Sequence, residues 1–387
     1  MKILFLSFYF EPDLCAGSFR NSSLFKELLK NLDSNDQVDV ITTLPNRYDS
    51  YNVKAAQKEN PFPNVSIHRV AIPKHGSGIL GQIKSFKKFY FEALEIANQE
   101  KYDLVYASSS RLFTAFLGSK LARNQNSKLY LDIRDIFRET IVDVFNNKIL
   151  KYTLNLILIP IENYTFKKAD HINLVSEGFM SYFKKYNTKF TYFTNGIDAV
   201  FLKEHNSSAS KNAKRTILYA GNIGESQGLH IILPKAAKAL EENFKFIVVG
   251  DGGAKDKLIK EIEILNVKNI QLLDPVNRNK LIEYYQKSDY LFLHLNKQKA
   301  FERVLPSKIF EYGAFNKPII AGVSGFSRVF LENNVKNTIT FNPGNIEELV
   351  TNLSDYTYVN YERECFKKKF SRLEINKEMA KSIYKLI

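Results

Sequence analysis

The sequence predicts an α/β protein with two domains, each built around a mainly parallel sheet. Short β-branched or aromatic runs alternate with longer amphipathic stretches, which is typical of βαβ units. The chain has 387 residues, more than the roughly 250–300 that one hydrophobic core usually holds. A polar, turn-rich stretch at 204–212 interrupts the alternation. We therefore expect a first domain over 1–198, a linker over 199–213, a second domain over 214–369 and a final helix over 370–387.

The individual elements follow from this alternation. In the first domain we expect strands at 2–7, 38–42, 66–70, 104–106, 129–131, 171–175 and 190–193, and helices at 18–32, 83–98, 112–123, 150–168 and 178–186. In the second domain we expect strands at 216–220, 244–249, 270–272, 290–293, 318–321 and 337–341, with helices between them. Ligands bind beyond the carboxyl ends of parallel strands. The chemistry is therefore expected on loops that follow strands, in a cleft between two facing domains.

Composition excludes several classes of protein. The two cysteines lie far apart, which argues against a disulfide framework or a structural zinc site and fits a reducing cytoplasm. The short apolar N-terminal run is expected to form a buried strand rather than a signal peptide, and no apolar stretch approaches the roughly 20 residues of a membrane helix. The net charge is +14. It favours anionic partners, and because no nucleic-acid module is visible we expect nucleotide phosphates or lipid headgroups.

The first motif with chemical content follows the strand expected at 216–220. Gly221-Asn-Ile-Gly is followed by Gln227 and Gly228, where a helix is expected to begin. Glycines allow backbone N–H groups to approach a phosphate, and a helix N-terminus adds partial positive charge. An ordinary tight strand-to-helix turn would produce the same pattern.

A second motif lies at 301–321. Pro306 suits the first turn of a helix, so the amides of Leu305 and Ser307 and the ammonium of Lys308 are placed to meet a diphosphate. Glu311 falls one turn beyond Ser307 on the same helical face, where a carboxylate can accept both hydroxyls of a ribose. The alternative for Glu311 is a solvated surface glutamate.

Two further segments belong to the first domain. After the first strand, Gly17 and Ser18 open a helix whose first turn carries Arg20, which could reach an acceptor phosphate or lie on the surface. After the strand at 129–131, Asp132-Ile-Arg-Asp places Asp132, Arg134 and Asp135 together. Charges there are costly to bury unpaired. They therefore either form a structural ion-pair network or line a cleft.

A basic amphipathic stretch at 79–90 carries Lys84, Lys87 and Lys88. No acidic residue occurs between Glu59 and Glu92. Such a helix can lie on an anionic membrane surface, or it can simply face the core with a solvated lysine side. Some motifs are absent: there is no Asp-x-Asp for a metal-bridged diphosphate and no phosphate-binding P-loop. His171 and His294 lie in strand-like runs and are expected in or near the core.

Together these segments resemble the GT-B glycosyltransferases of family 4 over nearly the whole chain. The resemblance rests on the order of weak motifs: the Gly17 loop, Glu162 with Ala169-Asp, a strand ending at Ser176, Thr194-Asn-Gly-Ile-Asp, Gly221-Asn-Ile-Gly, Val248-Val-Gly-Asp-Gly, the Glu311 segment and Phe341-Asn-Pro-Gly. Within the family, the Gly221 and Glu311 segments resemble the branch that transfers N-acetylated amino and deoxy sugars in O-antigen and capsule assembly.

The resemblance implies a retaining, metal-independent transfer from a UDP-sugar, without a cofactor, to a polysaccharide or lipid-linked acceptor. It implies two Rossmann-like domains, with the nucleotide on the C-terminal one, the acceptor on the N-terminal one and the last helix crossing back. The enzyme would be cytoplasmic or on the inner face of the cell membrane. Glu311 matches the family's ribose-binding glutamate, and we expect Lys308, Glu311 and Arg303 to be the catalytic residues. The implied donor-binding residues are Gly221, Asn222, Gly224, Gln227, Gly250, Val276, Leu305, Ser307, Lys308 and Glu311. The implied acceptor or cleft residues are Gly17, Ser18, Arg20, Asp132, Arg134 and Asp135.

The sequence also departs from the family pattern. Arg303 stands where the family usually has a glutamate, eight residues before Glu311, and Asn222 and Gln227 replace an arginine and a lysine. The diphosphate charge must then be met by Lys308 and Arg303. A non-catalytic homologue and a nucleotide-sugar 2-epimerase therefore stay open as alternatives.

Overall fold

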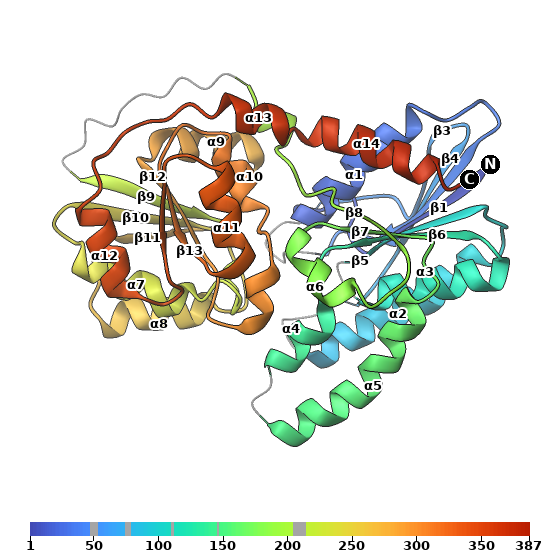
Figure 1. Ribbon diagram of the computed structural model, residues 1–387, viewed down its shortest axis with the longest axis horizontal. Helices are drawn as coiled ribbons and strands as arrows, with labels where there is room; N and C mark the ends of the chain where they lie inside the picture. The colour runs from blue at the N-terminus through green and yellow to red at the C-terminus, as the bar shows by residue number, and fades with distance from the viewer. Residues whose placement is uncertain (47–52, 74–78, 110–111, 145–146, 204–213) are drawn as a thin grey trace. The chain divides into compact units, whose positions relative to one another are not determined.

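The chain folds into two compact units, each with its own sheet (Figure 1). The computed structural model describes residues 1–46, 53–73, 79–109, 112–144, 147–203 and 214–387. Unit 1 comprises Met1–Asn195 together with Arg372–Ile387, and unit 2 comprises Gly196–Ser371. The predicted α/β class with two parallel-dominated sheets is confirmed. Most of the expected linker, at 204–213, lies outside the described residues.

Unit 1 contains an eight-stranded sheet in the order β3-β4-β2-β1-β5-β6-β7-β8. Its strands are β1 (Lys2–Ser7), β2 (Gln37–Thr43), β3 (Lys58–Phe62), β4 (Val65–Val70), β5 (Leu104–Ser109), β6 (Lys128–Ile133), β7 (His171–Leu174) and β8 (Lys189–Thr191). Neighbouring strands pair in parallel, except that β3 is antiparallel to β4. The central strands β1 and β5 are almost entirely buried, because helices cover both faces of the sheet.

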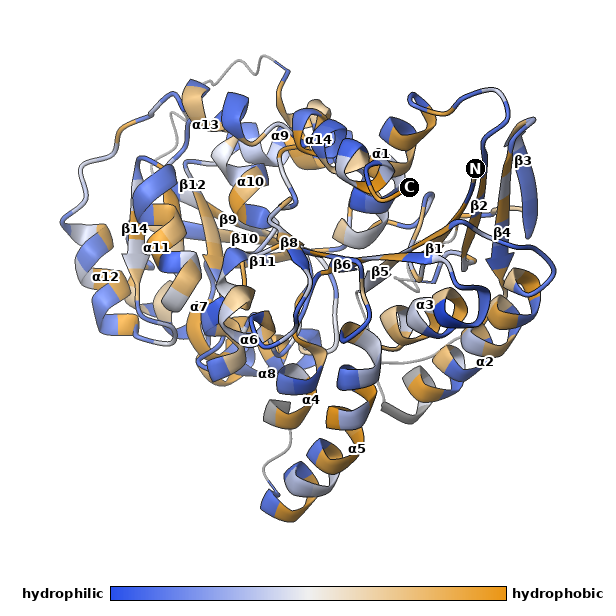
Figure 2. Cartoon of the chain, turned by 45° about the vertical axis from the view of Figure 1, so that its right-hand side comes forward, coloured by the Kyte–Doolittle hydropathy of each residue, from blue (hydrophilic) through white to orange (hydrophobic). Residues whose placement is uncertain are grey.

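The helices of unit 1 divide between the two faces (Figure 1, Figure 2). They are α1 (Ala16–Leu29), α2 (Ile79–Ala97), α3 (Leu112–Gln125), α4 (Phe137–Val144), α5 (Lys148–Phe166), α6 (Met180–Phe183) and α14 (Arg372–Tyr384). Helices α1 and α14 lie on one face, and α2, α3 and α5 on the other. No helix in the described parts of the chain is long and apolar enough to cross a membrane.

Helix α14 completes the core of unit 1 although it is the last helix of the chain. Met379, Ala380 and Ile383 are fully buried and belong to the same cluster as Leu24 and Leu28 of α1. Polar contacts add to this packing: Asn376 Nδ2 donates to Ser23 Oγ over 2.9 Å, and Tyr384 Oη donates to the Leu28 carbonyl over 2.8 Å. The predicted return of the last helix to the N-terminal part of the chain is therefore observed.

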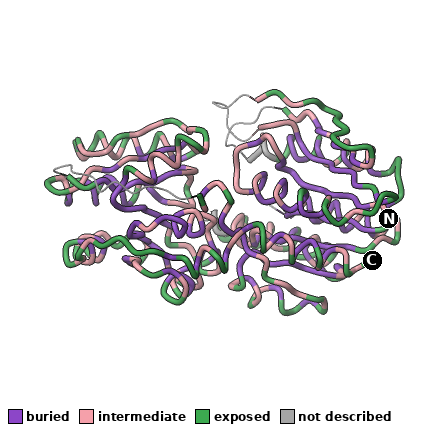
Figure 3. Tube along the Cα trace, turned by 90° about the horizontal axis from the view of Figure 1, so that it is seen from above, coloured by how far each residue is buried: buried purple, intermediate pink, exposed green. Residues whose placement is uncertain are grey.

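Unit 2 contains a six-stranded parallel sheet in the order β11-β10-β9-β12-β13-β14. Its strands are β9 (Arg215–Ala220), β10 (Phe244–Val249), β11 (Ile270–Leu273), β12 (Tyr290–His294), β13 (Ile319–Gly322) and β14 (Thr338–Phe341). Its helices are α7 (Leu229–Ala239), α8 (Lys255–Ile264), α9 (Arg278–Lys287), α10 (Lys308–Gly313), α11 (Gly325–Asn334), α12 (Ile346–Ser354) and α13 (Glu364–Lys369). In each unit the buried residues concentrate along the strands and the inner faces of the helices (Figure 3).

The structure contains elements that the sequence pattern did not predict. Strand β3 is exposed along its length and contains Pro61, so it lacks the apolar alternation of a strand; it pairs at the sheet edge, where proline is tolerated. Helices α4 and α13 are short, with eight and six residues, too short to show a helical period.

Candidate functional site

Two glycines shape the edge of the unit 2 sheet at the carboxyl ends of β9 and β10. The Gly221 N–H donates to the Val249 carbonyl over 2.8 Å, and the Gly250 N–H donates to the Leu273 carbonyl over 2.9 Å. Both have positive φ, at 140° and 155°. A Cβ on Gly250 would lie 1.9 Å from the Gly221 carbonyl oxygen, so a side chain there would force the backbones apart. Glycine is therefore required for the close approach of these two loops.

The loop after Gly221 is closed by its own polar side chains. Gln227 Oε1 accepts hydrogen bonds from Asn222 Nδ2 over 3.0 Å and from the Gly224 N–H over 3.2 Å. Tyr219 Oη donates to the Asn222 carbonyl. Asn222 and Gln227 thus fix the shape of the loop and bring no charge to it.

Lys308 brings a positive charge to this loop. Its Nζ occupies the space beside Gly221, 2.1 Å from where a Cβ on that glycine would stand, and lies 5.1 Å from the centroid of the Tyr219 ring. Ser307 precedes Lys308 at the start of α10, and its carbonyl accepts from the N–H groups of Phe310 and Glu311. The structure therefore unites Lys308 with Gly221, two predicted donor residues that lie far apart in the sequence.

Glu311 is held on the same helix by a buried tyrosine. Tyr285 Oη donates to Glu311 Oε2 over 3.2 Å, and burial, together with the carboxylate, raises the pKa of Tyr285 well above its usual value. The phenol therefore stays protonated and remains a donor. The neighbouring Tyr312 Oη accepts from the Ala220 N–H over 3.2 Å. This contact ties α10 to the end of β9, so Glu311 and the Gly221 loop share one scaffold.

The other predicted donor residues lie around this scaffold. Leu305 is buried, whereas Val276, Arg303 and Ser307 are half-buried. Val276 follows β11, whose carboxyl end lies at the same sheet edge as Gly250. Arg303 ends the short 3₁₀ helix Lys299–Arg303, ahead of α10.

A residue without a predicted role at the site, His294, supports the loop from below. The Gly344 N–H donates to His294 Nε2 over 3.0 Å, so Nδ1 carries the proton and donates to the Gln227 carbonyl over 2.7 Å. Burial lowers the pKa of His294 to about 4, although the Gln227 contact opposes the shift. The neutral imidazole joins the end of β12 to the Gly221 loop and to the loop after β14. The sequence predicted only its near-core position.

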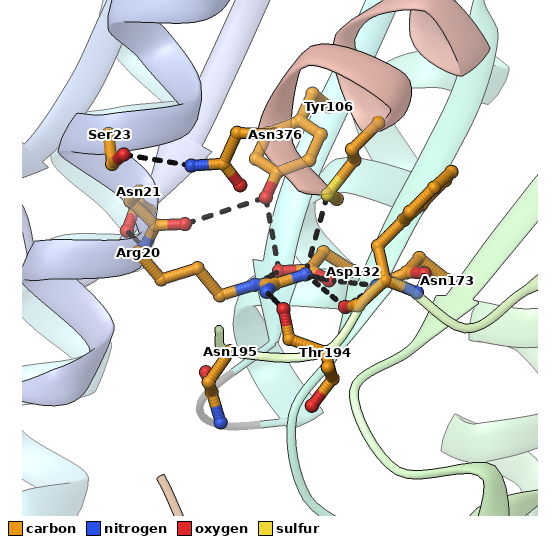
Figure 4. A network of polar contacts seen from close by, with 12 residues as sticks. Arg20, Asn21, Ser23, Tyr106, Asp132, Asn173, Thr194, Asn195 and Asn376 are labelled. Atoms are coloured by element: carbon orange, nitrogen blue, oxygen red, sulfur yellow. Dashed lines mark hydrogen bonds and ion pairs between the residues drawn. The ribbon is translucent and has the colours of Figure 1, made fainter. Parts of the chain in front are cut away.

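In unit 1, Arg20 and Asp132 form a bidentate ion pair with no solvent exposure (Figure 4). Arg20 Nε donates to Asp132 Oδ2 over 2.8 Å, and Nη2 donates to Oδ1 over 2.9 Å. The remaining guanidinium donors reach the carbonyls of Phe193 and Thr194 and the sulfur of Met379. Asn173 Nδ2 and Tyr106 Oη complete the shell of Asp132.

The burial of Arg20 and Asp132 gives no support to the predicted acceptor or cleft role of these two residues, because neither side chain is exposed. The first-turn position of Arg20 suggested an exposed side chain, but α1 is packed under α14 and the guanidinium donors are used within the protein. Burial alone would raise the pKa of Asp132, but the charge and hydrogen bonds of Arg20 outweigh it and the pKa lies below its usual value. Of the two possibilities left by the sequence, the structural ion-pair network is the one observed.

The other predicted acceptor residues lie nearby. Ser18 is buried, and its N–H donates to Cys15 Sγ at the start of α1. Arg134 Nη1 lies against Gly17, 2.4 Å from where a Cβ would stand. Asp135 accepts from Thr140 Oγ1 over 3.2 Å, and burial raises its pKa above the usual value. Gly17, Arg134 and Asp135 thus remain together as candidates at one edge of the sheet.

Comparison with known proteins finds one family model that matches most of unit 2. Residues 200–371 match the family described as glycosyl transferases group 1. This part of the chain is a glycosyl transferases group 1 domain. Within the whole chain, 96 residues are 35% identical to WcaI of Escherichia coli (strain K12), whose name assigns it provisionally to colanic acid biosynthesis as a glycosyl transferase. That match covers 25% of this chain and 23% of WcaI.

Solved structures extend the likeness to both units. Anabaena Alr3699/HepE, in complex with UDP and glucose, superposes with a TM-score of 0.68 at 17% identity, covering 100% of both chains. WaaG, a glycosyltransferase involved in lipopolysaccharide biosynthesis, superposes with a TM-score of 0.65 at 15% identity, covering 99% of this chain and 95% of its own. At these identities the likeness establishes the fold. The chain has the GT-B fold around its glycosyl transferases group 1 domain.

Two further observations concern metal sites and surface charge. Within the described residues, no group of three or more His, Cys, Asp or Glu side chains is arranged to hold a metal ion. Lys84, Lys87 and Lys88 all lie on the exposed side of α2, whereas Phe86 and Phe89 face the core. The amphipathic character predicted for this helix is therefore observed.

We predict that Arg20→Met destabilises unit 1 by about 3–5 kcal/mol, because Asp132 would remain buried without its countercharge. Urea unfolding, followed by a probe specific to unit 1, measures the loss. Lys26→Met on the same helix is the control: Lys26 is 60% exposed and pairs with Glu11, so its loss should cost at most about 1 kcal/mol. Equal effects of the two substitutions would contradict the structural role of Arg20.

We also predict that stability falls on acidification between about pH 6.5 and pH 4, partly through His294. In that range the unfolded chain binds a proton that the buried imidazole excludes. With a folded pKa of about 4 against 6.5, the loss from this residue is roughly 3 kcal/mol. His294→Gln should be less stable than wild type at pH 7 but should lose less further stability by pH 4.5. Parallel pH profiles, measured by chemical denaturation, would refute this assignment.

Proposed function

We propose that this protein is a retaining, metal-independent glycosyltransferase that uses a UDP-sugar donor. The observation that carries the proposal is the position of Lys308 Nζ against the Gly221 loop, with Glu311 one turn further along α10. A cation beside closely packed backbone at the carboxyl ends of parallel strands suits a diphosphate. A carboxylate at the distance of one helical turn suits the ribose of the same nucleotide.

The diphosphate would be neutralised mainly by Lys308. In this loop Asn222 and Gln227 are hydrogen-bonded to each other, so they shape the loop and supply no charge. The Lys308 ammonium, held over Gly221, is then the charged group best placed to meet the phosphates. Arg303 would contribute from the segment just ahead of α10.

The ribose would bind at Glu311. Tyr285 fixes one carboxylate oxygen through its hydrogen bond, which orients the carboxylate before the nucleotide arrives. Preorganisation of this kind lowers the ordering cost of binding.

In the reaction, the bond between the anomeric carbon and the diphosphate oxygen breaks as the acceptor oxygen bonds to the same face of that carbon. The acceptor's hydroxyl proton passes to the departing diphosphate. Negative charge grows on that diphosphate in the transition state, so Lys308 contributes by stabilising the leaving group. The protein then needs no side chain as a base.

Surface polysaccharide synthesis is the proposed setting. It is supported by the names of the similar proteins, which refer to colanic acid and lipopolysaccharide biosynthesis. UDP as the donor nucleotide is supported by the HepE complexes with UDP and with UDP-glucose. The proposed sugar, an N-acetylated amino or deoxy sugar, rests on the resemblance of the Gly221 and Glu311 segments to one branch of family 4.

The proposed acceptor is a polysaccharide or a lipid-linked saccharide, met at the cytoplasmic face of the cell membrane. Lys84, Lys87 and Lys88 on the exposed side of α2 support an electrostatic contact with anionic lipid. Gly17, Arg134 and Asp135 are the remaining acceptor candidates of unit 1.

A second candidate is a GT-B protein that binds a nucleotide without catalysis. It is favoured by the neutral Asn222–Gln227 pair and by Arg303 in place of a glutamate. UDP binding without turnover on any acceptor would support it, whereas conversion of a UDP-sugar in the absence of an acceptor would indicate the 2-epimerase.

We predict that UDP raises the melting temperature of the full chain in the presence of EDTA, and that Glu311→Ala weakens this UDP binding by about tenfold or more, because a carboxylate that accepts hydroxyl hydrogen bonds is lost. A UDP titration followed by thermal shift measures both effects. Glu332→Ala, an exposed glutamate of α11 in the same unit, is the control and should bind UDP as wild type does. No shift with any nucleotide would refute the proposed donor site, and wild-type affinity in Glu311→Ala would refute the ribose assignment.

We predict that Lys308→Ala lowers kcat by roughly 10²–10³-fold, the usual effect of removing one electrostatic stabiliser of transition-state charge. The fall in kcat should exceed the rise in KM, because the diphosphate gains charge as the bond breaks. Turnover with saturating UDP-sugar measures this, with the exposed Lys260→Ala of α8 as the matched control. A change in KM alone would show that Lys308 only binds the donor.

A further inference from the structure

Helix α5 exposes most of its large apolar side chains, and its only carboxylate, Glu162, is buried. Its exposed large hydrophobic residues are Ile149, Leu150, Tyr152, Leu156, Ile157, Ile159 and Tyr164, with exposures from 36% to 75%. Its buried residues are Leu158, Glu162, Thr165 and Phe166. A surface helix normally has the opposite arrangement, with apolar residues on the core side. Figure 2 shows the hydrophobic colour along α5 where it extends away from the sheet.

The exposed face of α5 is also uncharged. No Asp, Glu, Lys, Arg or His occurs between Lys151 and Glu162. Glu162 itself is buried. Its Oε2 accepts from Arg138 Nε over 2.8 Å and from Tyr182 Oη over 2.5 Å. The apolar face therefore continues over several turns without an interrupting charge.

The helix is held firmly in this orientation. Arg138 of α4 also donates to Asn155 Oδ1 over 2.7 Å, and so grips the core side of α5 at two positions separated by nearly two turns. Arg123 of α3 donates to the Tyr164 carbonyl, and its guanidinium lies 4.0 Å from the centroid of the Tyr164 ring. A rotation that buried the apolar face would break these contacts and expose Glu162 and Arg138 without their partners.

The surroundings of the face fit a lipid surface. Exposed Lys148 begins the helix, and exposed Lys167 and Lys168 follow its end. Tyr152 and Tyr164 are exposed on α5, and tyrosine rings are enriched at the interface between a bilayer and water. From 144 to 169 the only acidic residue is the buried Glu162. An apolar face bordered by one sign of charge complements an anionic bilayer.

We propose that the exposed apolar face of α5 docks unit 1 on an anionic lipid bilayer, with its isoleucine and leucine side chains inserted among the headgroups and upper acyl chains. This goes beyond a contact through the lysines of α2, because it assigns insertion to a different helix. It complements the proposed function by bringing the enzyme to a lipid-linked acceptor, but the apolar insertion is argued from α5 and does not require the proposed activity.

Flotation of the full chain with vesicles tests the docking. The vesicles contain about three parts phosphatidylcholine to one part phosphatidylglycerol, with pure phosphatidylcholine for comparison. Wild type should float with the anionic vesicles, and the triple variant Ile149→Ser, Leu156→Ser, Ile157→Ser should partition about tenfold or more weakly, because three inserted apolar side chains are lost. The double variant Ile264→Ser, Val329→Ser is the matched control, since these residues of unit 2 are 62% and 51% exposed; it should float as wild type does.

Two other outcomes would overturn the docking. Absence of flotation by wild type, or equal partitioning of wild type and the triple variant, would show that α5 does not insert. A wild-type dimer that the triple variant dissociates, with flotation of neither, would show that a second copy of the chain covers the face. The substituted residues are exposed, so the triple variant should keep the wild-type melting temperature and UDP shift. If UDP does not raise the melting temperature of wild type but wild type still floats with anionic vesicles, the proposed function is refuted and the docking is not.

Discussion

The buried ion pair of Arg20 and Asp132 organises unit 1. A guanidinium and a carboxylate with no solvent exposure are tolerable only if nearly every donor and acceptor is satisfied, and here the partners come from separate parts of the chain. Asp132 belongs to β6, Asn173 belongs to β7, and the Phe193 and Thr194 carbonyls follow β8. Met379 reaches the same guanidinium from α14. The requirement to satisfy one charge pair therefore fixes the first helix, two strands, the segment that leaves the sheet and the last helix in a single arrangement.

The candidate site of unit 2 is not organised around a buried ion pair. It is built largely from backbone. Gly221 and Gly250 have positive φ and no side chain, so the loops after β9 and β10 can pack directly against each other. Neutral groups then hold the loops: the Asn222–Gln227 pair closes one of them, and the uncharged His294 joins it to the next strand. The charges proposed to meet the nucleotide lie on α10, at Lys308 and Glu311, and just ahead of it, at Arg303. Neutral hydrogen-bonded groups hold the loops in place, and the few charged side chains beside them are therefore fixed before a ligand binds. Such a fixed arrangement favours electrostatic preorganisation.

The sequence predicted strands better than it predicted partners. Runs such as 2–7 and 244–249 are apolar, short and bounded by turns, and they became β1 and β10 within a residue. Strand β3 was not predicted because its sequence, Lys58–Phe62, is mostly polar and contains Pro61, so it lacks the apolar alternation of a strand. Arg20 was misjudged for a different reason: its position in a helix is local information, but its partner Asp132 is 112 residues away, and only the sheet brings them together. The contacts of Tyr285 with Glu311 and of Tyr312 with β9 are equally non-local. The position of Lys308 in the first turn of α10 could be predicted, because Pro306 and Ser307 are its neighbours in sequence and determine the local backbone.

Helix α5 shows a limit of periodicity itself. The stretch 154–161 is apolar on nearly every side, so its sequence does not indicate which side packs inward; the position of Glu162 beside Arg138 decides it. The lysines of α2 suggested a membrane contact from charge alone. In the structure, α2 and α5 lie on the same face of the unit 1 sheet with α3 between them, and they carry complementary properties: exposed lysines on one and exposed aliphatic side chains on the other. Peripheral binding generally needs two weak signals, electrostatic attraction and apolar insertion. In the proposed docking, the lysines of α2 and the aliphatic side chains of α5 would supply these two contributions from one face of the unit 1 sheet.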